Sequence, residues 1–377
     1  MSITLRSAAL VGAAALVLAA CGSAPEDEET ATEAATETED AAAEQVDFKA
    51  CMVSDEGGFD DQSFNQSGAA GLEQAQDELG LEINLLESQG AQDYGPNIDA
   101  LLQDDCGIII TVGFAMGSAT VEAALANPDQ LFAIVDDTPD GDPSTPDSFE
   151  PPPDNVKPLV YDTVQASYLA GYLAAGMTET GTVATYGGRP FPTVTIFMDG
   201  FVDGVAKYNE EKGTDVEVLG WDKESQDGSF TGDFEDENKG KQLTANFIQQ
   251  GADIILPVAG PVGRGSAAAA SESDGVKVIW VDSDGFLTVP EFSELFLTSV
   301  LKQISGATFE VTQDAVNDEF DPSQYIGTLD NDGVGIAPYH DFEDEVPDEL
   351  KAEIEDLQQQ IIDGTLVVES PSSPQPA

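Results

Sequence analysis

The sequence predicts an α/β protein with two similar lobes, each a doubly wound parallel sheet, and with a ligand cleft between them. From residue 46 onward, short and almost wholly apolar runs alternate with helical patterns, which is typical of parallel strands that helices bury on both faces. Cys106–Gly113 and Ala252–Gly260 echo each other, because each leads from an apolar run into a helix start rich in small residues. A chain of 377 residues with 41% hydrophobic residues is long enough for two domains.

The expected strands form two series along the chain. The first series is Asp47–Val53, Ile83–Leu86, Ile108–Val112, Leu131–Val135 and Val156–Tyr161, and the second is Thr182–Tyr186, Val216–Gly220, Ile254–Val258 and Val276–Val281. Apolar residues at helical spacing predict helices over Gly68–Leu79, Ser167–Met177, Phe197–Lys212 and Asn238–Gln250. In such sheets ligands bind at the carboxyl ends of the strands, so the ends of two lobes can face each other across a cleft.

The lobes are expected to share the chain unevenly. The first lobe should comprise residues 46–157 and about 285–322, and the second lobe should comprise 158–284 and about 323–366. The Asp/Pro-rich stretch 136–154 is long for a loop and should decorate an edge. The tail 367–377 is expected to be disordered.

The N-terminus resembles an export signal. Arg6 precedes the apolar run Ala8–Ala20, which is too short to span a bilayer, so residues 1–20 are predicted to be a signal peptide. The run ends in Leu-Ala-Ala-Cys, which resembles a bacterial lipobox in which Cys21 is lipidated; the alternative is an ordinary signal peptide with an incidental cysteine. Residues 22–45 are acidic and of low complexity, and we expect a disordered tether there.

The charge excludes several classes of partner. The chain carries 72 Asp+Glu against 13 Lys+Arg, a formal net charge of −59. Nucleic acids and anionic membrane surfaces require clustered bases, which are absent from this sequence. Most of the excess lies outside the tether, so it belongs to the folded surface, where high salt would screen it. A halophilic surface is therefore predicted, with a solubility bias or an alkaline habitat as alternatives.

Two further cysteines, Cys51 and Cys106, each lie at the start of a strand-like run. Outside the cell they can form a disulfide if the two strands are neighbours. The alternative is a pair of buried thiols.

Catalytic chemistry has little support in the sequence. With His340 as the single histidine, no nucleophilic triad and no zinc set can be assembled. Asp282–Gly285 and Asp330–Gly333 resemble calcium loops but lack the glutamate at the twelfth position. Gly260–Gly265 does not have the spacing of a dinucleotide-binding loop. We therefore expect no catalytic residue, no metal and no cofactor.

A binding site has better support. Val53–Gln66 follows the first strand, contains two adjacent glycines and opens a helix. At such a junction Phe64 and Asn65 can reach the cleft, where an aromatic face and an amide suit a nucleobase or another flat heterocycle. The alternative is that Phe64 packs in the core and that Asp60 or Ser63 caps the helix.

These and further motifs together resemble the basic membrane protein family, the purine nucleoside receptor-like lipoproteins of ABC transport. The segments that carry the resemblance are Asp55–Asn65, Thr111–Phe114, Phe132–Asp136, Ala166–Ala175, Phe197–Phe201, Asn238–Lys241, Gln250–Ile255, Val258–Gly260, Trp280–Asp282 and Thr298–Lys302. They span roughly residues 47–365, in one order.

The resemblance implies a type I periplasmic-binding-protein fold with a defined set of ligand contacts. It places Phe64 and Phe197 on either side of a base, and Asp55 and Asn65 at the edge of the base. It gives the ribose to Asp136, Gly260, Asp282 and Lys302. The physical alternatives are core packing for Phe197, a strand-end turn for Asp282 and a surface position for Lys302.

The resemblance also implies the role. We expect a monomeric, lipid-anchored substrate-binding protein on the outer face of the cell membrane, which closes on a purine nucleoside and delivers it to an ABC permease. Several acidic residues around one lysine should reject phosphates, which favours a nucleoside over a nucleotide. The alternatives are a receptor for another small neutral solute, such as a sugar or a thiamine-like heterocycle, and an exported hydrolase that acts on nucleosides.

Overall fold

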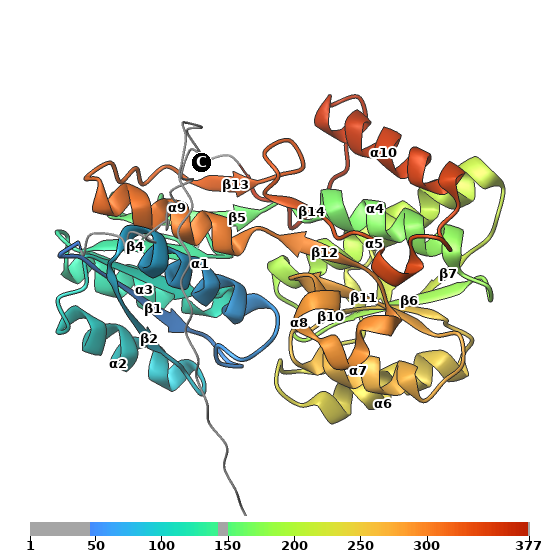
Figure 1. Cartoon of the computed structure of the whole chain (residues 1–377), viewed down its shortest axis with the longest axis horizontal. Helices are drawn as coiled ribbons and strands as arrows, with labels where there is room; N and C mark the ends of the chain where they lie inside the picture. The colour runs from blue at the N-terminus through green and yellow to red at the C-terminus, as the bar shows by residue number, and fades with distance from the viewer. Residues whose placement is uncertain (1–45, 142–149, 376–377) are drawn as a thin grey trace, which may run out of the picture. The chain divides into compact units, whose positions relative to one another are not determined.

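Two six-stranded sheets form the framework of the computed structural model, which describes residues 46–141 and 150–375 (Figure 1). The predicted signal peptide, Cys21 and the tether lie outside these residues. Within the described ranges, no helix has both the length and the apolar character needed to cross a membrane.

The first sheet has the strand order β13-β5-β4-β3-β1-β2, and all its pairs are parallel. Its strands are β1 (Lys49–Ser54), β2 (Glu82–Leu86), β3 (Ile108–Val112), β4 (Leu131–Val135), β5 (Val156–Tyr161) and β13 (Tyr325–Gly327). Helices α1 (Phe64–Leu79) and α9 (Ile304–Val316) pack together, and so do α2 (Ala91–Leu102) and α3 (Gly117–Ala126). The short helix η1 (Phe114–Met116) precedes α3.

The second sheet has the order β14-β12-β11-β10-β6-β7, and β14 is its one antiparallel member. Its strands are β6 (Thr182–Gly187), β7 (Glu217–Leu219), β10 (Ile254–Val258), β11 (Lys277–Asp282), β12 (Phe296–Lys302) and β14 (Val334–Ile336). Its helices are α4 (Val164–Met177), α5 (Pro192–Lys212), α6 (Glu237–Gln249), α7 (Val262–Ser271), α8 (Gly285–Thr288) and α10 (Asp348–Ile362). A small hairpin of β8 (Trp221–Asp222) and β9 (Asp227–Gly228) and the short helices η2 (Pro290–Leu295) and η3 (His340–Phe342) complete this lobe.

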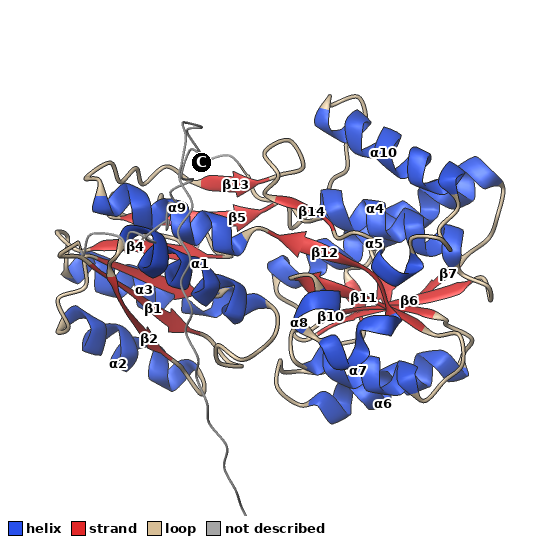
Figure 2. Cartoon of the chain, viewed as in Figure 1, coloured by secondary structure: helices blue, strands red, loops and turns tan. Residues whose placement is uncertain are grey.

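The helices cover both faces of each sheet, as Figure 2 shows. In the second lobe α4 packs on α5, while α6 packs on α7. The close approach of α4 to α5 depends on glycine, because a Cβ atom on Gly171 would lie 2.1 Å from the Phe201 carbonyl oxygen, and one on Gly204 would lie 2.0 Å from that of Tyr168. The predicted class, two doubly wound parallel-sheet lobes, is confirmed. The similarity between the segments Cys106–Gly113 and Ala252–Gly260 has a structural reason, because they contain β3 and β10, which both occupy the fourth position in their sheets.

The predicted boundaries between the lobes were wrong in three places. The chain passes from the first to the second sheet after β5, which continues to Tyr161, four residues beyond the predicted end of the first segment. Strand β12 lies in the second sheet, although the sequence placed about 285–322 in the first lobe. Strand β13 pairs with β5 in the first sheet, although 323–366 was placed in the second lobe. Three-residue strands such as β13 and β14 are too short to show a periodicity.

The tail is ordered as far as the structure describes it, so the prediction of disorder was wrong for residues 367–375. The Ser370 hydroxyl donates a hydrogen bond to Asp199 Oδ2 at 2.6 Å, and the Ser373 hydroxyl donates to Asp162 Oδ1 at 2.9 Å. Asp199 is fully buried and also accepts from Trp221 Nε1. The tail is thus held in place by hydrogen bonds to the buried Asp199 and the half-buried Asp162.

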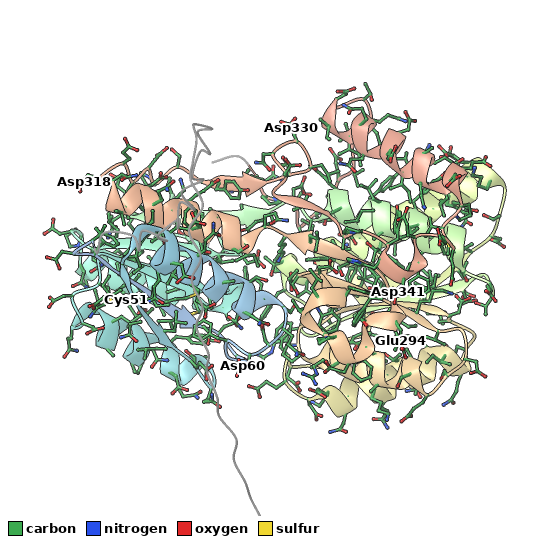
Figure 3. The ribbon with its side chains drawn as sticks, viewed as in Figure 1. Cys51, Asp60, Glu294, Asp318, Asp330 and Asp341 are labelled. Atoms are coloured by element: carbon green, nitrogen blue, oxygen red, sulfur yellow. A yellow bond between two sulfur atoms is a disulfide. The ribbon has the colours of Figure 1, made fainter. Side chains whose placement is uncertain are left out.

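A disulfide joins Cys51 in β1 to Cys106, just before β3, with Cα atoms 5.9 Å apart. The two strands are neighbours in the first sheet, as the pairing requires. Asp104 lies close to both sulfurs, but the disulfide removes the thiolates that a metal would need. Figure 3 shows Cys51 among the strands, whereas the exposed Asp60, Asp318 and Asp330 belong to loops.

Candidate functional site

One cavity lies between the carboxyl ends of the two sheets, and all eight predicted ligand-binding residues line it. They are Asp55, Phe64, Asn65, Asp136, Phe197, Gly260, Asp282 and Lys302. The space left open to water there is about 70 Å³, below the roughly 300–1,000 Å³ typical of sites that enclose a drug-sized ligand. The lobes are therefore close together, and a ligand of nucleoside size requires them to separate.

Strand ends aim the acidic side chains at this cavity. Asp136 follows β4 and Asp282 ends β11, and both have left-handed backbones, with φ of 66° and 68°. Aspartate is among the few residues other than glycine that adopt this conformation readily. Asp55 follows β1 and lies against Gly113, where an added Cβ would come within 2.1 Å of Asp55 Oδ2. Glycine at that position therefore lets the carboxyl group approach β3.

A buried lysine neutralises part of this acidity. Lys302 ends β12 and is 5% exposed, and its ammonium group forms an ion pair with Asp136 and lies 3.7 Å from Asp282 Oδ1. Burial raises the pKa of the Asp136 carboxyl, and the charge of Lys302 opposes this rise. Two carboxyl groups and one ammonium offer acceptors and donors to a hydroxylated ligand, and their arrangement opposes a phosphate.

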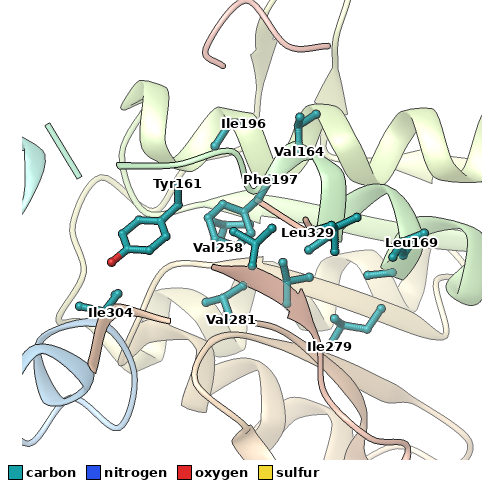
Figure 4. Packing of buried hydrophobic residues seen from close by; sticks show 14 of the residues in the cluster. Tyr161, Val164, Leu169, Ile196, Phe197, Val258, Ile279, Val281, Ile304 and Leu329 are labelled. Atoms are coloured by element: carbon teal, nitrogen blue, oxygen red, sulfur yellow. The ribbon is translucent and has the colours of Figure 1, made fainter. Parts of the chain in front are cut away.

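Aromatic rings from both lobes surround the same ammonium group. Lys302 Nζ lies 5.2 Å from the ring centroid of Phe64, at the start of α1, and 5.1 Å from that of Phe197 in α5. Figure 4 shows Phe197 beside Val258 and Val281, with which it shares the buried core. Phe197 thus lines the cavity and also packs in the core. Phe64 is half-buried.

A second pair of polar groups, Asp55 and Asn65, lies at the first-lobe side of the cavity. Asn65 Nδ2 donates to Asp55 Oδ1 at 2.9 Å. Asn65 is 1% exposed, yet its Oδ1 atom has no hydrogen-bond partner among the described residues. Burial raises the pKa of the Asp55 carboxyl to about 8, while the bond from Asn65 opposes the rise. At neutral pH this carboxyl is mostly protonated, so it can donate a hydrogen bond beside an unused acceptor.

The cap of α1 is Asp61, which the sequence did not single out. Its carboxylate accepts from the backbone N–H groups of Ser63, Asn65 and Gln66, at 3.0, 2.7 and 3.0 Å. Burial raises the pKa of Asp61 to about 6 against these bonds. The alternative drawn from the sequence named Asp60 or Ser63 as the cap, but the Ser63 hydroxyl instead donates across the cleft to Asp282 Oδ2 at 2.9 Å. Several acidic residues in this loop could cap the helix equally well from sequence alone.

Three further phenylalanines extend the apolar wall of the cavity. Phe191 lies 5.3 Å from Phe114 and 6.0 Å from Phe234 between ring centroids, and all three line the cavity. Phe191 immediately precedes α5, which starts five residues before the predicted Phe197. The Pro-Phe-Pro sequence around it was a helix-start signal that could have placed Phe191 at the cleft.

The fragment that resembled a calcium loop has a different role. Asp284 caps α8 through the Phe286 N–H group and also contacts His340 Nε2 at 2.7 Å. The Asp282 side chain belongs to the cleft. Neither carboxylate shares a metal-like cluster among the described residues.

Two α/β lobes that enclose a cavity of aromatic, acidic and amide groups have the architecture of a substrate-binding protein. The chain belongs to the family described as ABC transporter substrate-binding protein PnrA-like, whose model matches residues 48–372. This is a family of substrate-binding proteins rather than enzymes. The resemblance that the motifs indicated is thereby confirmed.

Relatives match the chain along most of its length. It is 30% identical over 377 residues to the CD4+ T-cell-stimulating antigen of Listeria innocua, covering 95% of this chain and 96% of that protein. It is 28% identical over 345 residues to the ABC transporter nucleoside-binding protein BmpA of Lactococcus lactis, covering 86% and 90%. An ABC transporter solute-binding protein from Aeropyrum pernix has the same fold, with a TM-score of 0.75 and 23% identity over 85% of this chain and 94% of that one.

Proposed function

We propose that the protein is the lipid-anchored, extracytoplasmic receptor of an ABC importer and that its ligand is a purine nucleoside. The observation that carries the proposal is the meeting of Phe64 and Phe197, from opposite lobes, within about 5 Å of one buried ammonium group. Asp55 and Asn65 lie on one side of this point, and Asp136 and Asp282 accompany Lys302 on the other. The nucleoside-binding relative from Lactococcus lactis supports the choice of ligand class.

The base would lie between the two phenylalanine rings. Stacking of a base on an aromatic side chain contributes about 1–3 kcal/mol. The protonated Asp55 carboxyl would donate to a ring nitrogen, and the unpartnered Asn65 Oδ1 would accept from an exocyclic amine. A donor on Asp55 beside an acceptor on Asn65 is complementary to the edge of adenine, which presents a ring nitrogen as acceptor beside an exocyclic amine as donor.

The ribose would be held by the charged cluster. Carboxylates accept from two hydroxyls in one fork, so Asp136 and Asp282 suit a diol, and Lys302 can donate to a ribose oxygen. Gly260 has φ of +51°, and no atom lies within 4 Å of an added Cβ, so its backbone faces open space in the cleft. A phosphate would add negative charge to a cluster that already has two acidic groups for one base.

The protein would deliver the bound nucleoside to the permease from the membrane surface. Lipidation of Cys21 would hold the protein, as a monomer, on the outer face of the membrane, and residues 22–45 would tether it beside the permease. Hinge closure around the nucleoside would present it for transport. Labelling of cells with radioactive palmitate should mark the wild-type protein and fail to mark Cys21→Ser; equal labelling of both would contradict the anchor.

Titration calorimetry at high salt tests which class of ligand the protein binds. Adenosine, guanosine and inosine should bind, and AMP should bind far more weakly. The conservative variant Lys302→Met should weaken nucleoside binding, while Lys241→Met, which removes an exposed lysine on α6, should leave it unchanged. Tight binding of AMP without nucleoside binding would overturn the proposal, and so would a sugar as the co-purified ligand identified by mass spectrometry.

A further inference from the structure

The arginines that the structure describes lie where they contact the opposite lobe. The sequence contains three arginines, Arg6, Arg189 and Arg264, and the structure describes the last two. Both belong to the second lobe, and both reach the loop that follows β1 in the first lobe. Arg189 Nη2 lies 2.7 Å from Glu56 Oε2, and Arg264 Nη1 donates to Gln62 Oε1 at 2.5 Å.

The two arginines differ in what else they contact. Arg264 is also held within its own lobe by Glu237 and Glu291, at 3.4 and 2.8 Å. Arg189 has no other ion-pair partner among the described residues, and its Nε atom has no hydrogen-bond partner there. Among the described residues its guanidinium group contacts Glu56 of the first lobe and no side chain of its own lobe, so we infer that the side chain of Arg189 serves the contact between the lobes.

The strand orders place this contact far from the hinge. The chain crosses between the sheets beside β5, β13, β12 and β14, which form one edge of each sheet. Glu56 follows β1 and Arg189 follows β6, and both strands are fifth from that edge. Lys302 and its carboxylates lie nearer the hinge, at β12, β11 and β4. When the lobes open about the hinge, the ends of β1 and β6 separate more than the ends of these strands.

The loop that carries Glu56 is itself docked on the second lobe. The Gln62 carbonyl oxygen accepts from Trp280 Nε1 at 3.3 Å and from the Ser283 hydroxyl at 3.0 Å. Gln62 has a left-handed φ of 57°, which is uncommon for this residue type. Contacts from a second lobe thus hold a backbone conformation that the loop would seldom adopt alone.

We propose that the Arg189–Glu56 ion pair, assisted by Arg264 on Gln62, is a latch that holds the mouth of the cleft closed and sets the rate at which ligand leaves. This inference rests on the proposed binding function. Both lobes are acidic and repel each other, so a cation placed at the mouth favours closure directly. Arg189 is a positioning residue, because it does not line the cavity. Its partner Glu56 does line the cavity, so the effect on ligand release is read from Arg189→Gln, and Glu56→Gln is judged by the ligand-free distances.

A double-mutant cycle tests the latch. The variants are Arg189→Gln, Glu56→Gln and the two combined, with Arg189→Lys as the charge-conserving rescue. Lys241→Gln is the matched control, because it breaks a 2.7 Å ion pair with Glu272 within the second lobe. Spin labels on cysteines introduced at the exposed Asp99 in α2 and Ser271 in α7 report the distance between the lobes without ligand. Of the three native cysteines, Cys51 and Cys106 are already paired, and Cys21 is replaced by serine in every protein compared.

Each single latch variant should shift the ligand-free distance distribution to longer values, and Arg189→Gln should raise the nucleoside dissociation rate by about two- to five-fold, the range for a partly exposed pair. The combined variant should add nothing to either single change. Arg189→Lys and Lys241→Gln should behave as wild type. An unchanged distance distribution in Arg189→Gln, or additive effects in the cycle, would overturn the latch. Because the distances are measured without ligand, this holds even if no nucleoside binds.

Discussion

The pH dependence of binding should differ between guanosine and adenosine, because Asp55 titrates close to neutral pH. The edge of guanine presents N–H donors, so guanosine needs an ionised Asp55 carboxylate as acceptor. The edge of adenine presents a ring nitrogen as acceptor, so adenosine needs the protonated carboxyl as donor. Burial raises the pKa of Asp55 to about 8, which leaves the protonated form in excess at neutral pH.

The size of the effect follows from that pKa of about 8. The ionised fraction of Asp55 is about 1% at about pH 6 and about a quarter at about pH 7.5. The association constant of guanosine should therefore rise roughly twentyfold across this window, whereas that of adenosine should fall by only about a quarter. At about pH 7, ionising Asp55 costs guanosine about 1.4 kcal/mol relative to a carboxylate that is already ionised.

Calorimetric titrations of both nucleosides at matched salt give the two curves. Asp61 titrates in the same window, with a pKa of about 6, but it caps α1 in either complex, so its effect cancels in the ratio of the two constants. In Asp55→Asn the ratio should not change with pH, since the amide has no proton to lose. Parallel pH curves for guanosine and adenosine in the wild-type protein would refute the reading of the base edge by Asp55.

Four other changes test separate parts of the structure. Phe64→Ala should weaken nucleoside binding by about 1–3 kcal/mol through lost stacking, and an unchanged calorimetric affinity would place the base elsewhere. Replacing Cys51 and Cys106 by serine opens a bridge between residues 55 positions apart and should lower the free energy of unfolding by about 2–4 kcal/mol, seen as an earlier urea midpoint. Deleting residues 369–377 removes Ser370 from the buried Asp199 carboxylate and should cost about 1–3 kcal/mol of stability; an unaltered melting temperature would show that this contact is dispensable. Molar NaCl should raise the melting temperature of a chain with net charge −59, and greater stability in dilute buffer would contradict a halophilic surface.

The cleft residues could be predicted from the sequence where a strand led directly to them. Asp136 and Asp282 end or follow long apolar strands, so their place at the carboxyl edge of a sheet follows from the parallel topology. The grouping of Asp55 with Asn65 was predictable from the loop after the first strand. The family resemblance was needed to single out Asp136 and Asp282 among many acidic residues. It was also needed for Phe197 and Lys302, because helical spacing alone favours core packing for the first and β12 was not recognised as a strand.

Contacts that depend on the path of a loop, on the spacing of the lobes or on residues far apart in the chain could not be predicted in the same way. Which of the acidic residues in 55–61 caps α1 depends on the path of the loop, and the structure selects Asp61. The partner of Arg189 depends on how far apart the lobes stand, which no local pattern encodes. The tail was predicted to be disordered from its composition, whereas Ser370 is fixed by a carboxylate more than 150 residues away in the chain.

The placement of the bases explains how so acidic a chain can still close on a ligand. Exposed lysines such as Lys241 pair with neighbouring carboxylates of their own lobe, where each contact contributes at most about 1 kcal/mol. Lys302 and Arg189 instead stand where the two acidic lobes face each other, the first buried near the hinge and the second at the mouth. High salt would weaken the general repulsion between the lobes, and it would screen the half-exposed Arg189 pair far more than the buried Lys302. In the proposed binding cycle, high salt would therefore weaken the latch and speed ligand release, while the buried cluster around Lys302 would keep its contacts with the ligand.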